Sequence, residues 1–301
     1  MKSKNPIMNI KTIILGMLLI CSISSFAQEP EIKKIVFPTG YESKIDEIYT
    51  KVDDWNGRLD IYYNPLSSKP TPVVLHIHGG GWNHGTKESQ TGFGLYFKAG
   101  FAVVNVEYRL VQVATAPAAI EDIRTALHYI KENAEKLNID PDKIVIEGGS
   151  SGAHLALMAG LLENNRIFDT NCSSELDMKV AAIISNYAPS DLPSLLINST
   201  LSNSLTKWLD IKANNHEFVA SVSPLTYIKK SSPPVFIVHG NADKIVPYSQ
   251  SVTLQKKLNE NGVNNEFITV EGGGHGSFDK EKKSEINLAL IEFLKKVEVI
   301  E

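Results

Sequence analysis

The segment that most constrains this chain is Gly-Gly-Ser-Ser-Gly at residues 148–152. It follows an apolar, strand-like run and precedes a stretch whose pattern predicts a helix over 151–163. A chain that turns so sharply from strand to helix has room only for small neighbours, and the turn pushes the central side chain into the open. We therefore expect Ser150 to be a nucleophile. Choosing Ser151 instead would place Ala153 at the last glycine position, so that alternative is weaker.

A serine hydroxyl is a poor nucleophile at neutral pH, so it needs a base and an acid that orients the base. His275 lies in a glycine-rich segment directly after an apolar run, and Asp243 follows another buried-looking run at 235–238. We expect both on loops at the carboxyl ends of strands, where they could form a relay with Ser150. Asp191 also follows a strand-like run and is the rival to Asp243.

Three consecutive glycines follow a third apolar run, in His-Gly-Gly-Gly-Trp at residues 78–82. Glycines let backbone N–H groups turn toward a developing negative charge, because no side chain blocks the approach. We assign an oxyanion hole to the amides of Gly80 and Gly81, together with the amide of Ser151. Trp82 is either a wall of the substrate pocket or an ordinary core residue.

Beyond residue 72, continuous apolar runs alternate with helical patterns, which is typical of a mostly parallel sheet covered by helices on both faces. Before it, runs 48–52 and 59–63 alternate in polarity around Asn56 and Gly57, which predicts an antiparallel hairpin at the sheet edge. Further strands are predicted at 101–106, 179–185, 234–239 and 266–270, and helices at 117–137, 249–261 and 281–296. We expect a single domain over 28–301, since the 43% hydrophobic content suffices for one large core.

The segment 191–222 has poor apolar periodicity. We expect one or two short helices there, either as a small cap in which Leu196 and Trp208 contact substrate, or as a loop with a few core anchors.

The N-terminus is typical of an export signal. Lysines precede an apolar stretch at 13–23, and Ser-Phe-Ala at 25–27 offers small residues for cleavage near Ala27. The apolar stretch is short for a membrane span, so we expect residues 1–27 to be removed and the mature protein to be periplasmic or secreted, without stable membrane insertion. Lipidation at Cys21 is less favoured, because bulky Ile20 precedes it.

The net charge and the spacing of the histidines argue against nucleic acid and metal ions as ligands. A net charge of −4 leaves no basic stripe, so nucleic acid is not expected as a partner. His76 and His78 form an H-x-H pair that would suit zinc, but no third ligand has convincing spacing, and we expect no metal or organic cofactor. His154 and His239 are near the predicted site and are interpreted as structural.

The ordered motifs resemble the α/β-hydrolase superfamily, and within it the hormone-sensitive-lipase-like carboxylesterases and the bacterial feruloyl- and acetyl-esterase-like group. The matching segments are 78–82, 108–110, 117–119 with Glu121 and Asp122, 140–141, 148–156, 223–224 and those around Asp243 and His275. The order Ser, Asp, His is that of this superfamily. Ser151 and Ala153 stand where the family more often has alanine and glycine, and both replacements are small.

The resemblance implies an α/β-hydrolase fold and a serine esterase mechanism without a cofactor. It also implies that Tyr108 and Arg109 form a structural clamp beneath the catalytic loops. The substrate class it suggests is a small-molecule or carbohydrate ester with a short acyl group, most plausibly acetyl. Two alternatives stay open: an amide-cleaving serine hydrolase, such as a formamidase or peptidase, and a non-catalytic binding domain with the same fold.

Overall fold

The structure, a computed structural model, describes Met1 and residues 35–172, 175–198 and 200–301. The predicted signal peptide therefore lies outside the described residues, apart from Met1.

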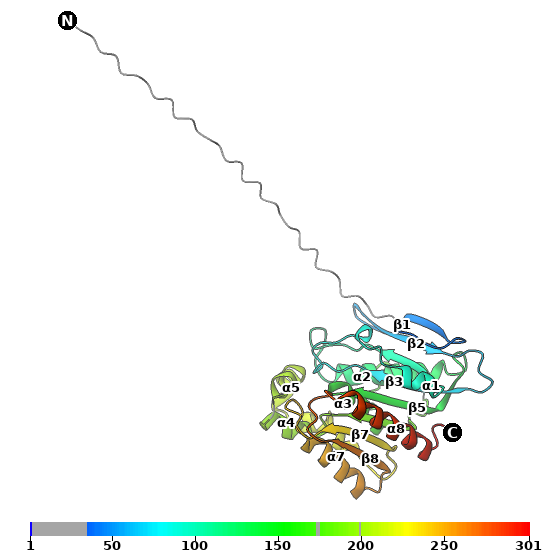
Figure 1. Ribbon diagram of the computed structural model, residues 1–301. Coiled ribbons are helices and arrows are strands. Elements are labelled where there is room, and N and C mark those ends of the chain that lie inside the picture. The colour runs from blue at the N-terminus through cyan, green and yellow to red at the C-terminus, as the bar shows by residue number, and fades with distance from the viewer. Residues whose placement is uncertain (2–34, 173–174, 199) are drawn as a thin grey trace. The chain divides into compact units, whose positions relative to one another are not determined.

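One eight-stranded sheet runs through the described part of the chain (Figure 1). Its strands are β1 (Glu42–Val52), β2 (Trp55–Tyr63), β3 (Thr71–Ile77), β4 (Ala102–Val106), β5 (Ile139–Gly149), β6 (Ala182–Asn186), β7 (Val235–Gly240) and β8 (Asn265–Val270). Their order is β1-β2-β4-β3-β5-β6-β7-β8. The pairs β1–β2 and β2–β4 are antiparallel, and all other neighbours are parallel. The predicted α/β-hydrolase fold, with an antiparallel N-terminal hairpin at the edge, is confirmed.

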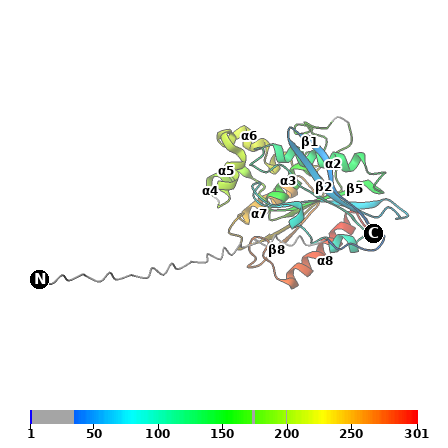
Figure 2. The ribbon, with the colours of Figure 1, turned by 90° about the horizontal axis from the view of Figure 1, so that it is seen from above.

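Helices cover both faces of this sheet (Figure 2). One face carries α2 (Ala118–Glu132), α3 (Ser151–Leu161) and α7 (Ser249–Glu260), and the other carries α1 (Gly94–Lys98) and α8 (Lys280–Lys296). The chain between β6 and β7 forms α4 (Leu192–Asn198), α5 (Ser202–Leu209) and α6 (His216–Ser221). Three short 3₁₀ helices are η1 (Lys87–Ser89), η2 (Asp210–Asn214) and η3 (Pro224–Tyr227). Of the helices in the described ranges, none combines the length and apolar character needed to cross a bilayer.

The continuous apolar runs follow from burial on both faces. Along β3, Val73, Leu75 and Ile77 join the core beneath α2 and α3, whereas Val74 joins the core beneath α1 and α8. A parallel strand covered on both sides needs apolar residues at every position rather than at alternate ones. Because β3 to β8 run parallel to one another, their carboxyl ends all lie at the same end of the sheet, and ligands bind at that end in sheets of this type.

Two predicted boundaries were wrong. The hairpin turns at Asp53 and Asp54, with Val52 opposite Trp55, and Asn56 and Gly57 lie inside β2. Asp53 adopts a positive φ of 50°, which aspartate tolerates better than most residues, so it serves the turn in place of a glycine. The helix predicted over 117–137 ends at Glu132, and the chain continues through turns to β5.

A buried lysine fixes the loop after β3 to the hairpin. The Lys87 ammonium lies 2.8 Å from both Asp46 and Asp60 and 2.7 Å from Glu88, while its side chain is only 2% exposed. Hydrogen bonds to these carboxylates raise the pKa of Lys87 despite its burial, so it stays charged. The Asn105 amide of β4 also donates to the Lys87 carbonyl oxygen at 2.7 Å. The cluster ties η1 to β1, β2 and β4.

Replacing this lysine should destabilise the fold. In Lys87→Met the buried Asp60 carboxylate loses its cation, so we expect the free energy of unfolding in urea to fall by about 3 kcal/mol. Asp46→Asn is the matched control, because the Asp46 side chain is 57% exposed and its loss should cost less than about 1 kcal/mol. An equal decrease in unfolding free energy in the two variants would contradict the larger contribution that we assign to the buried pair of Lys87 and Asp60.

Candidate active site

The predicted nucleophile occupies a strained turn. Ser150 links β5 to α3 with φ 56° and ψ −123°, a conformation that non-glycine residues rarely adopt. Its amide donates to the Asn186 carbonyl oxygen at 2.9 Å, which holds the turn against β6. A Cβ at Gly148 would lie 2.3 Å from the Gly152 backbone, and one at Gly152 would lie 2.3 Å from the Ile77 carbonyl oxygen. The glycines are thus required by close backbone approach.

The predicted base and acid form a hydrogen-bonded pair. His275 Nδ1 lies 2.7 Å from Asp243 Oδ2, and the other carboxylate oxygen accepts from the amides of Ile245 at 2.7 Å and Val246 at 3.1 Å. Burial alone would raise the pKa of Asp243, but hydrogen bonds from His239, His275 and the Ile245 amide outweigh it and hold this pKa well below its ordinary value. An ionised Asp243 can only accept, so Nδ1 of His275 carries the proton and Nε2 is left to act as a base.

Asp191, the rival acid, lies outside this pair. Its backbone amide donates to Gln250 Oε1 at 2.8 Å, and Asp243 is the carboxylate that contacts His275.

The ring of Tyr187 packs edge-on against His275, with centroids 4.7 Å apart, and limits how that imidazole can rotate.

A second imidazole supports the same carboxylate. His239 Nε2 lies 3.1 Å from both Asp243 Oδ2 and the Val246 carbonyl oxygen, and since both can only accept, Nε2 must be the protonated nitrogen. Its Nδ1 then accepts from the Ser251 hydroxyl at 2.7 Å. His239 is therefore a positioning residue: it donates to the same carboxylate oxygen of Asp243 that His275 contacts.

Gly80 and Gly81, two of the three residues predicted to supply oxyanion amides, line the same pocket as Ser150, whereas Ser151 does not. Gly80 and Gly81 have φ values of 123° and 58°, and a Cβ at Gly80 would lie 1.8 Å from the His84 carbonyl oxygen. Among the described residues, neither amide donates a backbone hydrogen bond, so both are available to a ligand. Ser151 begins α3, and its amide belongs to the helix N-terminus, where partial positive charge favours an anion.

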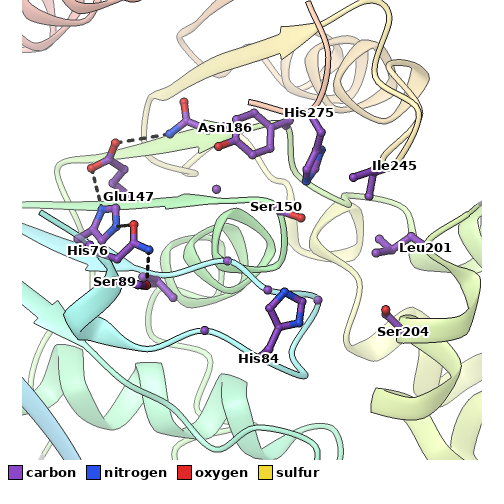
Figure 3. A pocket seen from close by; sticks show the side chains of 18 residues that line it. His76, His84, Ser89, Glu147, Ser150, Asn186, Leu201, Ser204, Ile245 and His275 are labelled. Carbon is purple, nitrogen blue, oxygen red and sulfur yellow. Dashed lines mark hydrogen bonds and ion pairs between the residues drawn. The ribbon is translucent and has the colours of Figure 1, made fainter. Parts of the chain in front are cut away.

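Ser150, His275 and the two glycines line a pocket of about 630 Å³. Figure 3 shows the Ser150 hydroxyl and the His275 ring facing the same space. Its wall includes Ile77, Gly79, Gly80, Gly81, Gly85, Gly149, His76, His84, Ser89, Gln90, Glu147, Asn186, Tyr187, Leu201, Ser204 and Ile245.

Three predicted substrate contacts need correction, because Trp82, Leu196 and Trp208 do not line this pocket. Trp82 and Trp208 are fully buried and stack on each other with centroids 4.7 Å apart, while Leu196 packs on the core. The cap segment instead contributes Leu201 and Ser204 to the pocket.

The cap segment, residues 191–222, both contributes residues to the pocket and is anchored in the core. It forms helices as expected, and buried Leu192, Leu205 and Leu209 anchor them in the core. Its pocket-facing residues thus project from an anchored element.

Three further histidines, His76, His78 and His154, have protein partners. His76 contacts Glu147 and Gln90, and His78 lies 2.7 Å from the Gly79 carbonyl oxygen, so the two do not converge on one point. Burial lowers the pKa of His154 to about 4, and this neutral ring accepts from the Trp82 indole at 3.3 Å. Across the described residues, no three His, Cys, Asp or Glu side chains form a group suited to a metal.

The predicted clamp is confirmed. Arg109 Nε lies 2.9 Å from Asp122, its Nη2 lies 3.1 Å from Glu121, and the Tyr108 hydroxyl donates to the His78 carbonyl oxygen at 3.1 Å. Neither residue faces the pocket around Ser150.

Several polar residues of the pocket were not predicted from the sequence. Among them, Asn186 is the last residue of β6, Tyr187 follows it, and His76 and Glu147 lie near the ends of β3 and β5. Polar residues at the carboxyl ends of parallel strands are the signal that could have identified them.

The close approach at the strained turn predicts that adding one methyl group to Gly152 lowers stability strongly. In Gly152→Ala the new Cβ meets the rigid end of β3, so we expect the free energy of unfolding in urea to fall by about 3 kcal/mol. Gly94→Ala is the control, because a Cβ there meets nothing within 4 Å. A Gly152→Ala protein as stable as the Gly94→Ala protein would refute the close approach.

The Asp243 pair predicts a pH dependence of stability. Because its pKa in the folded state lies below the ordinary 3.8, the carboxylate stabilises the fold above that value, and this contribution is lost as the pH falls through the folded-state pKa. The difference in unfolding free energy between the wild type and Asp243→Asn should therefore shrink on acidification from about pH 6 to about pH 3. Urea denaturation at each pH measures it, and a difference that stays constant would contradict the assignment.

Comparison with known proteins supports the fold and places the chain in a family. The BD-FAE family model matches residues 59–258. Esterase LipQ of Mycobacterium tuberculosis is 28% identical over 228 residues, which are 73% of this chain and 54% of LipQ. The chain spans about half the length of the curated relatives it matches.

Two solved structures are similar throughout most of the chain. A truncated carbohydrate esterase from gut microbiota is 29% identical with a TM-score of 0.70, covering 84% of this chain and 96% of its own. A bifunctional GH43-CE protein of Bacteroides eggerthii is 28% identical with a TM-score of 0.73, covering 85% of this chain and 35% of its own. The resemblance to α/β-hydrolase carboxylesterases is thereby confirmed, and this chain belongs to the BD-FAE family.

Proposed function

We propose that this protein is a serine carboxylesterase. The observation that carries the proposal is the strained Ser150, whose hydroxyl shares a pocket with His275, itself paired with the buried Asp243. A nucleophile, a base and an orienting acid in this arrangement are the requirements for acyl transfer.

In the proposed reaction, Ser150 Oγ attacks the ester carbonyl carbon while His275 Nε2 removes the hydroxyl proton. Asp243 keeps His275 in the required tautomer and stabilises the imidazolium that forms. The oxyanion accepts hydrogen bonds from the amides of Gly80, Gly81 and Ser151, and each donor contributes about 3 kcal/mol to stabilising the transition state.

The second half of the reaction uses the same groups. His275 returns its proton to the alcohol oxygen as the C–O bond breaks, which leaves an acyl-enzyme on Ser150. His275 then deprotonates a water that attacks the acyl carbon. As the bond from this carbon to Ser150 Oγ breaks, His275 returns the proton to Oγ, and the acid is released. No step requires a metal or an organic cofactor.

The proposed substrates are short acyl esters, and within this class we propose acetyl groups on carbohydrate. Two observations support this class: the similarity to a carbohydrate esterase, and the polar side chains that line part of the pocket. An acetyl group alone would leave most of the 630 Å³ empty, so the pocket has room for a larger alcohol.

Export belongs to the same proposal, with residues 1–27 as a signal peptide and a periplasmic or secreted product. Sequencing of the N-terminus of the protein recovered from its natural host tests it, with Gln28 as the expected first residue.

The reaction is tested with Ser150→Ala. We expect kcat for para-nitrophenyl acetate to fall at least about 1,000-fold, because the nucleophile is lost while the fold is kept. Ser249→Ala, an exposed serine on α7, is the control.

Para-nitroacetanilide, the amide with the same acyl group, separates ester from amide cleavage. Faster turnover of this amide would favour the amide-cleaving alternative, and sugar binding without turnover of either compound would favour a binding domain.

A further inference from the structure

The pocket has two chemically different ends on either side of Ser150. Figure 3 shows Leu201, Ser204 and Ile245 at one end and Asn186, Glu147 and His76 at the other. The first end contains two aliphatic side chains, whereas the second consists of polar groups. An ester also has two sides, the acyl group and the alcohol, which the carbonyl carbon joins.

The polar end is a connected network. Glu147 accepts from His76 Nδ1 at 3.2 Å and from the Asn186 amide at 3.5 Å. His76 Nε2 lies 3.3 Å from Gln90 Oε1, and the Gln90 amide donates to the Ser89 hydroxyl at 2.9 Å. We call these five residues the polar wall. Dashed lines in Figure 3 mark the contacts of Glu147 with His76 and Asn186.

The polar wall occupies positions that would otherwise belong to the core. His76 and Glu147 are register partners on β3 and β5, and they follow Val74 and Val145, which are fully buried on the same face of the sheet. Their side chains are only 16% and 15% exposed. Placing a carboxylate and an imidazole there is unfavourable unless each is well paired, so packing alone does not account for them.

The wall is held in place from behind. Ser89 and Gln90 stand at the end of η1, which the Lys87 cluster fixes to the hairpin and to β4. Asn186 is fixed through its carbonyl oxygen, which accepts the Ser150 amide. Polar groups positioned this firmly suit recognition of a ligand, because little ordering is left to be done on binding.

The charges at the polar wall favour a neutral ligand over an anionic one. A carboxylate offers about four acceptor sites. Those of Glu147 accept from His76 and Asn186, and the Tyr96 hydroxyl is close enough to use a third, which leaves one for a ligand. Among the described residues, no lysine or arginine lines the pocket. An anionic ligand would therefore meet Glu147 without a compensating cation, whereas neutral hydroxyl groups can donate to it.

We propose that the polar wall is the subsite for the alcohol part of the substrate and that it recognises the free hydroxyl groups of a neutral sugar next to the acylated position. This inference rests on the proposed esterase function and adds a place for the sugar. The acyl group then lies at the end formed by Leu201 and Ile245.

The test compares two substrates that share an acetyl group. The first is a methyl glucoside carrying a single acetyl group, and the second is para-nitrophenyl acetate, whose alcohol has no free hydroxyl. We measure kcat/KM for both with the wild type, Gln90→Leu and Glu147→Gln. Since a lost hydrogen bond to a buried polar group weakens recognition, the ratio of sugar ester to nitrophenyl ester should fall about tenfold or more in each variant.

Gln255→Leu on α7 is the matched control for the glutamine substitution, because it lies outside the pocket and should keep the wild-type ratio. Melting temperatures establish that each variant is folded, and Glu147→Gln serves if Gln90→Leu is not. An unchanged ratio in the folded variants overturns the inference.

A change in the preference between acetyl and longer acyl esters, with the sugar ratio intact, also overturns it, because the wall would then contact the acyl group. Both of these outcomes leave the esterase function standing. Only the failure of the wild type to hydrolyse any ester would remove that function.

Discussion

The site depends on one backbone constraint, the left-handed conformation of Ser150 between β5 and α3. This conformation is unfavourable for serine, so the surroundings must enforce it. Gly148 and Gly152 allow the two elements to approach, and every residue of α3 is buried. The helix therefore cannot shift to relieve the strain. The same turn presents the Ser150 hydroxyl to the pocket and brings the Ser151 amide beside it, so the proposed nucleophile and one proposed oxyanion donor arise from one feature.

The electrostatics of the site are organised around one buried carboxylate. Asp243 accepts from two imidazoles and two backbone amides, so its negative charge is stabilised before any substrate arrives. His239 contributes to this without reaching the pocket, and Ser251 fixes its ring. Because these donors are already oriented, little reorganisation is needed when His275 gains a proton.

The residues with strong local signals were predictable from the sequence. The turn at Ser150 needs glycines within four positions of each other, and His275 and Asp243 each follow an apolar run. Such signals depend on neighbours along the chain, so they survive without knowledge of the fold. The structure pairs His275 with Asp243 as expected, and it places Ser150 and Gly80 in the same pocket.

Features that depend on neighbours across the sheet were not predictable. His76 faces Glu147 only because β3 lies beside β5, although β4 and α2 intervene in the chain. The hairpin turn was also misplaced, because Asn56 and Gly57 are a stronger turn signal than the two aspartates that form it. The pairing of β1 with β2 therefore determines the position of the turn, and the local turn preference of Asn56 and Gly57 does not.

The stacked tryptophans show how the cap segment can affect the proposed reaction through residues that do not line the pocket. Trp82 directly follows the glycines of the proposed oxyanion hole, and Trp208 belongs to α5, so their contact joins this loop to the cap segment. The Trp82 carbonyl oxygen accepts from Val111, and that of Trp208 accepts from Ala116, so both are also fixed to the segment after β4. The position of the Gly80 and Gly81 amides is therefore set by core packing, and a cap that moved as a lid would have to break a buried aromatic stack. The anchored α5 thus acts as a brace for the oxyanion loop while Leu201 and Ser204 shape the pocket above it.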